Sequence, residues 1–214
     1  MEIEVLEGVF DANEIIAREN RALLDETGAF MINLMASPGA GKTSFIMKTL
    51  AGVKDSLTAA VIEGDIAGKV DSERIAETGV AAIQINTGGS CHLEAKQVNH
   101  ALRRLDLEGV DLVIVENVGN LVCPAEFKLG EDLKVMILSV AEGHDKPLKY
   151  PLMFSESDVL IVNKIDLIPH TDFDIEELEE TVLKMNPSVV IFRISCRTGE
   201  GVQEWTSWLE GRIK

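Results

Sequence analysis

The nine residues ASPGAGKTS, at positions 36–44, restrict the fold more than any other part of the 214-residue chain. They begin with Ala36, the last residue of the apolar run FMINLMA, and a helical pattern follows them. A strand, a glycine-rich loop that ends in Lys-Thr, and a helix make up the phosphate-binding P-loop, G-x-x-x-x-G-K-S/T. Ala36 replaces the first glycine of this pattern, which the end of a strand tolerates if φ is negative there. The segment therefore predicts a strand, a phosphate-binding loop and a helix, in that order.

Each part of this loop has an expected task. Gly39 and Gly41 let the backbone wrap around a phosphate with its N–H groups pointing inward, and the following helix adds the positive end of its dipole. Lys42 is expected to reach the β- and γ-phosphates of a nucleotide, and the Thr43 hydroxyl is expected to ligate Mg²⁺. The residues expected around the phosphates are Pro38, Gly39, Ala40, Gly41, Lys42, Thr43 and Ser44.

The remainder of the chain alternates between two patterns. Apolar runs typical of strands lie at 30–36, 59–63, 81–86, 111–117, 134–140, 158–163 and 189–195. Helical patterns lie at 42–51, 71–78, 92–105, 174–185 and 201–211. Alternation of nearly continuous apolar strands with helices is typical of a parallel sheet covered on both faces. We therefore expect a three-layer α/β fold of the P-loop NTPase type, with a mostly parallel central sheet flanked by helices.

The first 29 residues are expected to form a helical extension. The stretch DANEIIARENRALLDETG carries apolar residues at helical spacing, with Asp11 or Asn13 able to cap its start and Gly28 able to end it. We found no internal repeat, low-complexity tract or Ser/Gly linker. The expected organisation is an N-terminal helix over residues 1–29, packed on one P-loop domain over residues 30–214.

Charge and composition exclude some partners. The formal net charge is −16, which argues against a nucleic-acid partner because such binding relies on Lys and Arg to neutralise phosphates. The N-terminal sequence MEIEVLEGVF lacks the features of a signal peptide, and no apolar run reaches the ~20 residues of a membrane span. We therefore expect a cytoplasmic protein with no membrane contact. Three widely spaced cysteines in a reducing compartment point to metal ligation, redox chemistry or burial rather than disulfides.

The sequence VNKIDL at the end of the sixth strand indicates which base the nucleotide carries. It has the N-K-x-D arrangement of guanine-binding GTPases. Guanine presents two donors on one edge, and the Asp166 carboxylate can accept both, whereas adenine presents an acceptor there. Asn163 can bond the other edge and brace the P-loop, and the stem of Lys164 can lie along the base. The Ser195-Cys196-Arg197 segment, after the last strand, is expected to offer backbone N–H groups to guanine O6.

Two segments between these motifs are candidates for nucleotide-sensing switches. Asp65 can bind Mg²⁺, directly or through water, or orient the attacking water, or simply serve as a turn or cap residue. Glu116 stands where a Walker-B Asp usually stands and can hold the Mg²⁺ shell. Gly119 can offer its N–H to the γ-phosphate, so that its loop responds to hydrolysis. No obvious water-positioning Gln follows Gly119, so we expect slow GTP hydrolysis, on the order of 10⁻⁴ to 10⁻² per second.

Three soft ligands complete the candidate residues. Cys123 lies four residues past Gly119, so a ligand at Cys123 is tied to the expected phosphate sensor. Together with Cys91 and His92 it gives two thiolates and one imidazole, which suit tetrahedral Zn²⁺ or, in a flatter site, Ni²⁺. The alternative is that both cysteines are buried as small apolar residues and that His92 caps a helix.

Adjacent residues of a helix diverge by about 100°, so Cys91 and His92 cannot easily chelate one ion from one helical turn. Either the pair lies in the loop before the helix, or two chains pool their ligands across a two-fold axis. Three ligands per chain leave one coordination position to fill, which favours the second arrangement. In that case GTP, metal and dimerisation would be linked.

In their order along the chain these motifs resemble the hydrogenase nickel-incorporation GTPases, the HypB family of SIMIBI-class P-loop GTPases. The resemblance rests on SPGAGKT, Gly64-Asp65, Cys91-His92, ENVGNLVCPAEF and NKID, and spans about residues 30 to 196. It implies a metal-dependent, dimerising GTPase that helps to deliver Ni²⁺ into [NiFe]-hydrogenase. It also implies hydrogenase maturation proteins or the hydrogenase large subunit as partners. In the family, the metal ligands would correspond to Cys91, His92 and Cys123.

Three other interpretations stay open at this point. Urease accessory GTPases share the architecture, but would show Cys-Pro-His where this chain shows Cys-His. A metal-free regulatory GTPase would use its nucleotide state only to gate protein association. A metabolic P-loop kinase would bind ATP, which Asp166 should disfavour.

Overall fold

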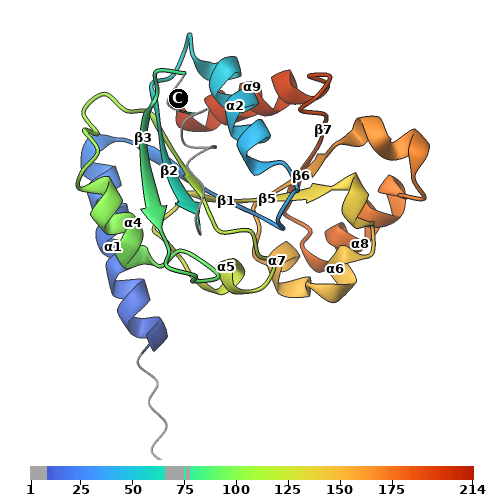
Figure 1. Cartoon of the computed structure of the whole chain (residues 1–214), viewed down its shortest axis with the longest axis horizontal. Coiled ribbons are helices and arrows are strands. Elements are labelled where there is room, and N and C mark those ends of the chain that lie inside the picture. Colours follow the sequence, from blue (N-terminus) through green and yellow to red (C-terminus); the bar gives the residue numbers. More distant parts are fainter. Residues whose placement is uncertain (1–8, 66–74, 76–77) are drawn as a thin grey trace, which may run out of the picture.

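The computed structural model describes residues 9–65, 75 and 78–214. A single sheet of seven strands forms its centre (Figure 1). The strands are β1 (Phe30–Ala36), β2 (Ala59–Asp65), β3 (Ala81–Asn86), β4 (Leu112–Glu116), β5 (Leu133–Ser139), β6 (Val159–Asn163) and β7 (Val190–Ile194). Each of the seven predicted strands is present, with bounds that differ from the predicted ones by at most two residues.

The strands are arranged in the order β3-β2-β4-β1-β5-β6-β7, and every pairing between them is parallel. The predicted mostly parallel sheet is therefore confirmed. Since all carboxyl ends of parallel strands meet at one edge, the loops after β1, β2, β4 and β6 come together there. The P-loop follows β1, which lies at the middle of the sheet.

Helices cover both faces of the sheet. On one face lie α2 (Lys42–Val53) and α9 (Val202–Ile213), and on the other lie α1 (Val9–Thr27) and α4 (Ala95–Leu102) (Figure 1). The second face also carries α5 (Cys123–Glu126), α6 (Lys146–Lys149), α7 (Pro151–Ser155) and α8 (Ile175–Met185). Two 3₁₀ turns, η1 (Val140–Glu142) and η2 (Ile165–His170), follow β5 and β6. The three predicted layers are present.

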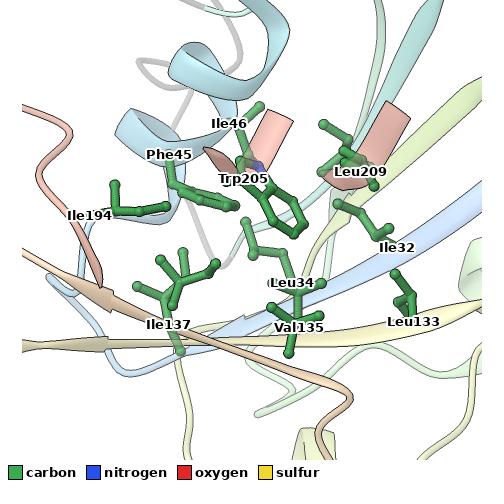
Figure 2. Close-up of a cluster of buried hydrophobic side chains, with 14 of the residues drawn as sticks. Ile32, Leu34, Phe45, Ile46, Leu133, Val135, Ile137, Ile194, Trp205 and Leu209 are labelled. Carbon is green, nitrogen blue, oxygen red and sulfur yellow. The ribbon is translucent and has the colours of Figure 1, made fainter. Parts of the chain in front are cut away.

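Trp205 is the centre of the core under α2 and α9 (Figure 2). Its ring is fully buried and lies 5.3 Å from the ring of Phe45. Its indole N–H donates to the Thr49 hydroxyl at 2.9 Å, so the one polar atom of the side chain is satisfied. The P-loop helix is thus fixed from both sides, by the sheet and by α9.

The N-terminal helix begins at Val9, earlier than predicted. Asp11 and Asn13 therefore lie inside the helix, and the prediction that one of them caps its start is wrong. Gly28 does end the helix, with a φ of 75°, and the N–H of Ala29 bonds to the carbonyl of Leu24. The helix lies against α4, where the amide of Asn20 meets that of Asn99.

The helix predicted over residues 92–105 begins at Ala95 instead. Glu94 has extended backbone angles, and its N–H donates to the side-chain oxygen of Gln97 at 2.8 Å. This capping bond starts the helix three residues later than the apolar pattern suggested. Cys91 and His92 consequently lie in the loop before α4.

The helix predicted over residues 71–78 falls mostly outside the described residues. Asp65 ends β2, where it pairs with Asn86, but its side chain lies outside the described part of the structure. Within the part that is described, no helix has the length and apolar character needed to cross a membrane.

Candidate nucleotide pocket and metal cluster

The loop after β1 has the backbone geometry of a phosphate cradle. Gly39 and Gly41 have φ values of 79° and 102°, in the left-handed region that favours glycine. A pocket of about 350 Å³ opens in front of the loop, lined by Gly39, Gly41, Lys42, Thr43, Glu116 and Gly119 among others. Ala36 stays within β1 and is buried, as its place in the motif requires.

Two carboxylates face this pocket from neighbouring strands. Glu116 ends β4, and its Oε1 lies 3.5 Å from the Thr43 hydroxyl. Glu63 is its register partner on β2, and it is also buried. Hydroxyl and carboxylate oxygens are the ligands that Mg²⁺ prefers, so Thr43 and Glu116 fit the expected magnesium ion. The sequence reasoning missed Glu63, although a charged residue closing the apolar run AAVIE is a signal that could have found it.

The loop after β6 holds the P-loop from the side. The Asn163 side chain donates to the carbonyl of Ala40 at 2.9 Å, and Lys164 Nζ donates to the carbonyl of Gly39 at 2.8 Å. The predicted contact of Asn163 with the P-loop is therefore present. Lys164 has a φ of 63°, the one positive φ among the non-glycine residues that the structure describes. A Cβ on Gly41 would lie 2.6 Å from Asn163 Nδ2, so the two loops touch without room for a side chain there.

Asp166 lies in a second pocket of about 310 Å³, lined also by Ser44, Lys164, Cys196 and Arg197. The Ser195 hydroxyl donates to the Asp166 carboxylate at 2.6 Å, and Arg197 lies 3.7 Å from it. Ser195 binds one carboxylate oxygen and Arg197 lies near the other, so two neighbours orient this partly buried carboxylate. A charged acceptor of this kind fits the expected contact with two donors of a base.

The backbone of the 195–197 segment differs from expectation. The N–H of Ser195 donates to the carbonyl of Glu200 at 3.0 Å, and that of Cys196 donates to Asn163 Oδ1 at 3.3 Å. Ser195 therefore acts on Asp166 through its hydroxyl rather than offering its N–H to a base. Burial raises the pKa of the Cys196 thiol to about 11, so this side chain stays neutral.

The loop after β4 touches both the P-loop and a cluster of sulfur and nitrogen atoms. A Cβ on Gly119 would lie 3.1 Å from Pro38, so this turn packs directly on the P-loop. Four residues later, Cys123 Sγ lies 3.1 Å from Cys91 Sγ, and Cys91 Sγ lies 3.5 Å from His92 Nδ1. One ligand atom from each of these three residues lies within 4.8 Å of the other two. One chain therefore brings all three together, because the pair 91–92 lies in a loop and not in a helix.

The cluster suits a soft divalent ion. Burial lowers the pKa of His92, which favours the neutral imidazole that metal ions bind. Phe127 stacks on this ring with centroids 4.0 Å apart, and no described residue accepts a hydrogen bond from its buried Nε2. The hydrogen bond with Cys123 raises the pKa of Cys91, so a bound cation would be needed to hold both sulfurs as thiolates.

Comparison with known proteins decides the family. The profile described as CobW/HypB/UreG, nucleotide-binding domain, matches residues 30–193. The hydrogenase maturation factor HypB of Azotobacter vinelandii is 50% identical over 209 residues, covering 97% of this chain and 69% of that protein. This chain belongs to the HypB family. The resemblance inferred from the motifs is confirmed.

Solved HypB structures share the fold. The crystal structure of HypB from Helicobacter pylori in complex with nickel has a TM-score of 0.90 and 37% identity, covering 94% of this chain and 95% of that one. HypB from Archaeoglobus fulgidus also has a TM-score of 0.90, with 35% identity over 95% of this chain and all of that one. Membership of the HypB family supports a P-loop nucleotide hydrolase.

Two asparagines of this chain join the pocket to the cluster, and sequence reasoning assigned neither. Asn117 follows Glu116 directly, and its buried side-chain oxygen accepts the N–H of Leu93, next to His92, at 3.0 Å. The Asn120 amide donates to the carbonyl of Cys91 at 3.2 Å. The segment between Glu116 and Cys123 thus contacts the P-loop, through Gly119 on Pro38 and the Asn120 N–H on the Ala36 carbonyl, and also the 91–93 loop.

Glu142 is a further contact that the sequence did not reveal. Its carboxylate accepts the N–H of Ser139 at 2.8 Å and also binds the hydroxyl of Ser37 in the P-loop. The 3₁₀ turn after β5 therefore supports the side of the phosphate cradle that Asn163 does not reach. The pattern Ser-Val-Ala-Glu, a capping box, was the available signal.

Proposed function

We propose that this HypB family member is a GTPase whose nucleotide state controls a nickel site at Cys91, His92 and Cys123, and that it delivers Ni²⁺ during [NiFe]-hydrogenase maturation. GTP would sit with its phosphates in the P-loop pocket and its base against Asp166. The metal ion is the cargo. Hydrogenase maturation proteins or the hydrogenase large subunit would receive it.

The continuous segment from Glu116 to Cys123 carries this proposal. It begins with a carboxylate in the phosphate pocket, packs on Pro38 through Gly119, and ends with a cluster sulfur. A displacement of the turn at Gly119 by the γ-phosphate would be transmitted to Cys123 over four residues, and to Leu93 through Asn117. Linkage then requires that bound metal change nucleotide affinity by the same factor.

Hydrolysis would use the residues around the phosphates. Lys42 would neutralise phosphate charge, and the backbone N–H groups of Gly39 and Gly41 would hold the phosphate oxygens. Thr43 and Glu116 would hold Mg²⁺, which stabilises charge on the transferred phosphoryl group when bound. No obvious water-positioning glutamine follows Gly119, so we expect turnover on the order of 10⁻⁴ to 10⁻² per second. Asp65 is the candidate to orient the attacking water.

The three ligands leave one coordination position open. We propose that a second copy of the chain completes or shields the site, because Cys91 is exposed and Val122, beside Cys123, is an apolar side chain with 51% exposure. Two thiolates and an imidazole accept Ni²⁺ in a flattened site and Zn²⁺ in a tetrahedral one, so Zn²⁺ is the competing ion.

The decisive experiment measures metal content and oligomeric mass together, with GDP and with a non-hydrolysable GTP analogue. We expect Ni²⁺ affinity and the dimer fraction to differ between the two nucleotides. Equal Ni²⁺ affinity in both nucleotide states would refute nucleotide control of the site. No Ni²⁺ binding in either state would leave a metal-free regulatory GTPase as the better description. Preference for ATP over GTP would point to a P-loop kinase.

A further inference from the structure

Helix α1 contributes no metal ligand, yet it binds the backbone on both sides of the metal cluster. Ala95 follows His92 by three residues and starts α4. Its N–H donates to Asn13 Oδ1 at 2.8 Å, and its carbonyl accepts from Asn20 Nδ2 at 2.9 Å. Both polar groups of this residue are therefore held by side chains of α1.

The same two asparagines hold the segment that follows Cys123. Asn13 Nδ2 donates to the carbonyl of Lys128 at 2.8 Å, and Asn20 Nδ2 donates to the carbonyl of Leu129, also at 2.8 Å. These carbonyls directly follow Phe127, whose ring stacks on His92. Each asparagine thus joins the chain after Cys91 and His92 to the chain after Cys123.

The contacts of Asn20 require an amide side chain at this position. Its side chain is fully buried, both of its amide hydrogens are used, and its oxygen accepts from Asn99 Nδ2 at 2.7 Å. A leucine of similar size would fill the same space without the cost of burying an amide. A reversed amide would set its oxygen against two carbonyls, so the network fixes one orientation.

We propose that Asn13 and Asn20 are positioning residues of the metal cluster, which set the separation of Cys91 and His92 from Cys123. The inference rests on the proposed function of that cluster. Hydrogen-bond partners behind the ligands of a metal site commonly change metal affinity by about 10- to 100-fold. Here the partners act on the backbone of the two ligand-bearing segments and not on the ligands themselves.

The test compares Asn20→Ala and Asn13→Ala with the parent chain. We expect the Ni²⁺ dissociation constant, measured by chelator competition, to rise about 10- to 100-fold. The thiolate-to-nickel absorption band should shift or weaken, and affinity for fluorescent GDP should stay within about two-fold. Asn13→Asp keeps the acceptor for the Ala95 N–H but loses the donor to the Lys128 carbonyl. Its nickel affinity should therefore lie between that of the parent chain and that of Asn13→Ala.

Asn186→Ala is the matched control. Asn186 is also a buried asparagine, and it donates to the carbonyls of Phe154, Ser155 and Ser157, none of which belongs to residues 91–95 or 123–129. We expect it to lose thermal stability as Asn20→Ala does but to keep the nickel affinity and absorption band. If Asn20→Ala fails to fold, Asn13→Ala, which removes a half-buried side chain, decides the question.

Two outcomes would overturn the inference, and they can be told apart. If the parent chain binds Ni²⁺ and the α1 variants keep its affinity and spectrum, α1 is only a structural helix and the proposed function survives. If the parent chain binds no Ni²⁺, the proposed function itself fails.

Discussion

The nucleotide pocket and the metal cluster lie at the same edge of the sheet but are supported in different ways. The pocket is braced by its own loops, since Asn163 and Lys164 of the base-binding motif donate to the carbonyls of Ala40 and Gly39 in the P-loop. The cluster is braced by a helix that supplies no ligand, through Asn13 and Asn20. The pocket is therefore held mainly by its own loops, with added support from Glu142 in the turn after β5, whereas the cluster depends on the docking of α1.

This difference has consequences for stability. Cys91 is exposed, and the cluster occupies loops whose positions are set by side chains from distant parts of the chain. Loops of this kind open at lower free energy than strands and their caps. We expect the pocket to tolerate changes in the cluster better than the cluster tolerates changes around it, and four predictions test this.

The largest effect should come from Asp166→Asn. The amide loses the charged acceptor for the two guanine donors, so the preference for GTP over ATP should fall by about 10⁴-fold. Calorimetric titration with both nucleotides measures it, with exposed Asp106→Asn as the control. Metal binding in the absence of nucleotide should not change. Unaltered GTP affinity would remove Asp166 from the base site.

Lys42→Ala should lower GTP turnover by about 10²- to 10³-fold, the usual cost of one group that stabilises transition-state charge. Phosphate release under saturating GTP measures the loss. Lys54→Ala, which removes a lysine just past the same helix, should keep full turnover. Parent-level hydrolysis by Lys42→Ala would contradict the assignment of the cradle.

Cys123→Ala should weaken Ni²⁺ binding by at least about 100-fold, beyond what loss of a supporting residue costs. It should also abolish metal-dependent dimerisation, measured by light scattering, while the monomer still binds GTP. Loss of GTP binding in this variant would show that the pocket depends on the cluster, and would break the comparison. A normal metal-loaded dimer would refute the ligand role of Cys123.

The smallest effect concerns Cys196. Its pKa of about 11, against an ordinary value of 9.0, follows from burial. At pH 8 the thiolate fraction falls about 100-fold, which the greater nucleophilicity of a more basic thiolate offsets in part, so alkylation should be about 10-fold slower than for an ordinary thiol. Raising the pH towards 11 should remove the difference. Mass spectrometry of the labelled peptide measures the rate, and fast labelling at pH 8 would contradict the burial.

Much of the nucleotide side could be predicted from sequence, because its residues stand at fixed distances from strand ends. Thr43, Glu116, Asn163 and Asp166 all lie where the motifs place them. The strand pattern was equally clear, since apolar runs in a parallel sheet are nearly continuous.

The support of the metal cluster could not be predicted in this way. Asn13 and Asn20 belong to no motif, and their partners Ala95, Lys128 and Leu129 are bound through backbone atoms, which any residue would offer. The start of α4 was predicted three residues too early, because the apolar pattern begins before the capping bond between Glu94 and Gln97. That error mattered, since the true start places Cys91 and His92 in a loop, where one chain can join them to Cys123.

Because Gly41 packs directly on Asn163, the pocket expected to hold the phosphates and the pocket expected to hold the base share one wall. Guanosine without phosphates would contact only the base pocket, and triphosphate without a base would contact only the phosphate pocket. Such fragments should together bind far less well than the intact molecule. The protein would therefore bind free phosphate and nucleosides weakly and would bind the complete guanine nucleotide much more tightly.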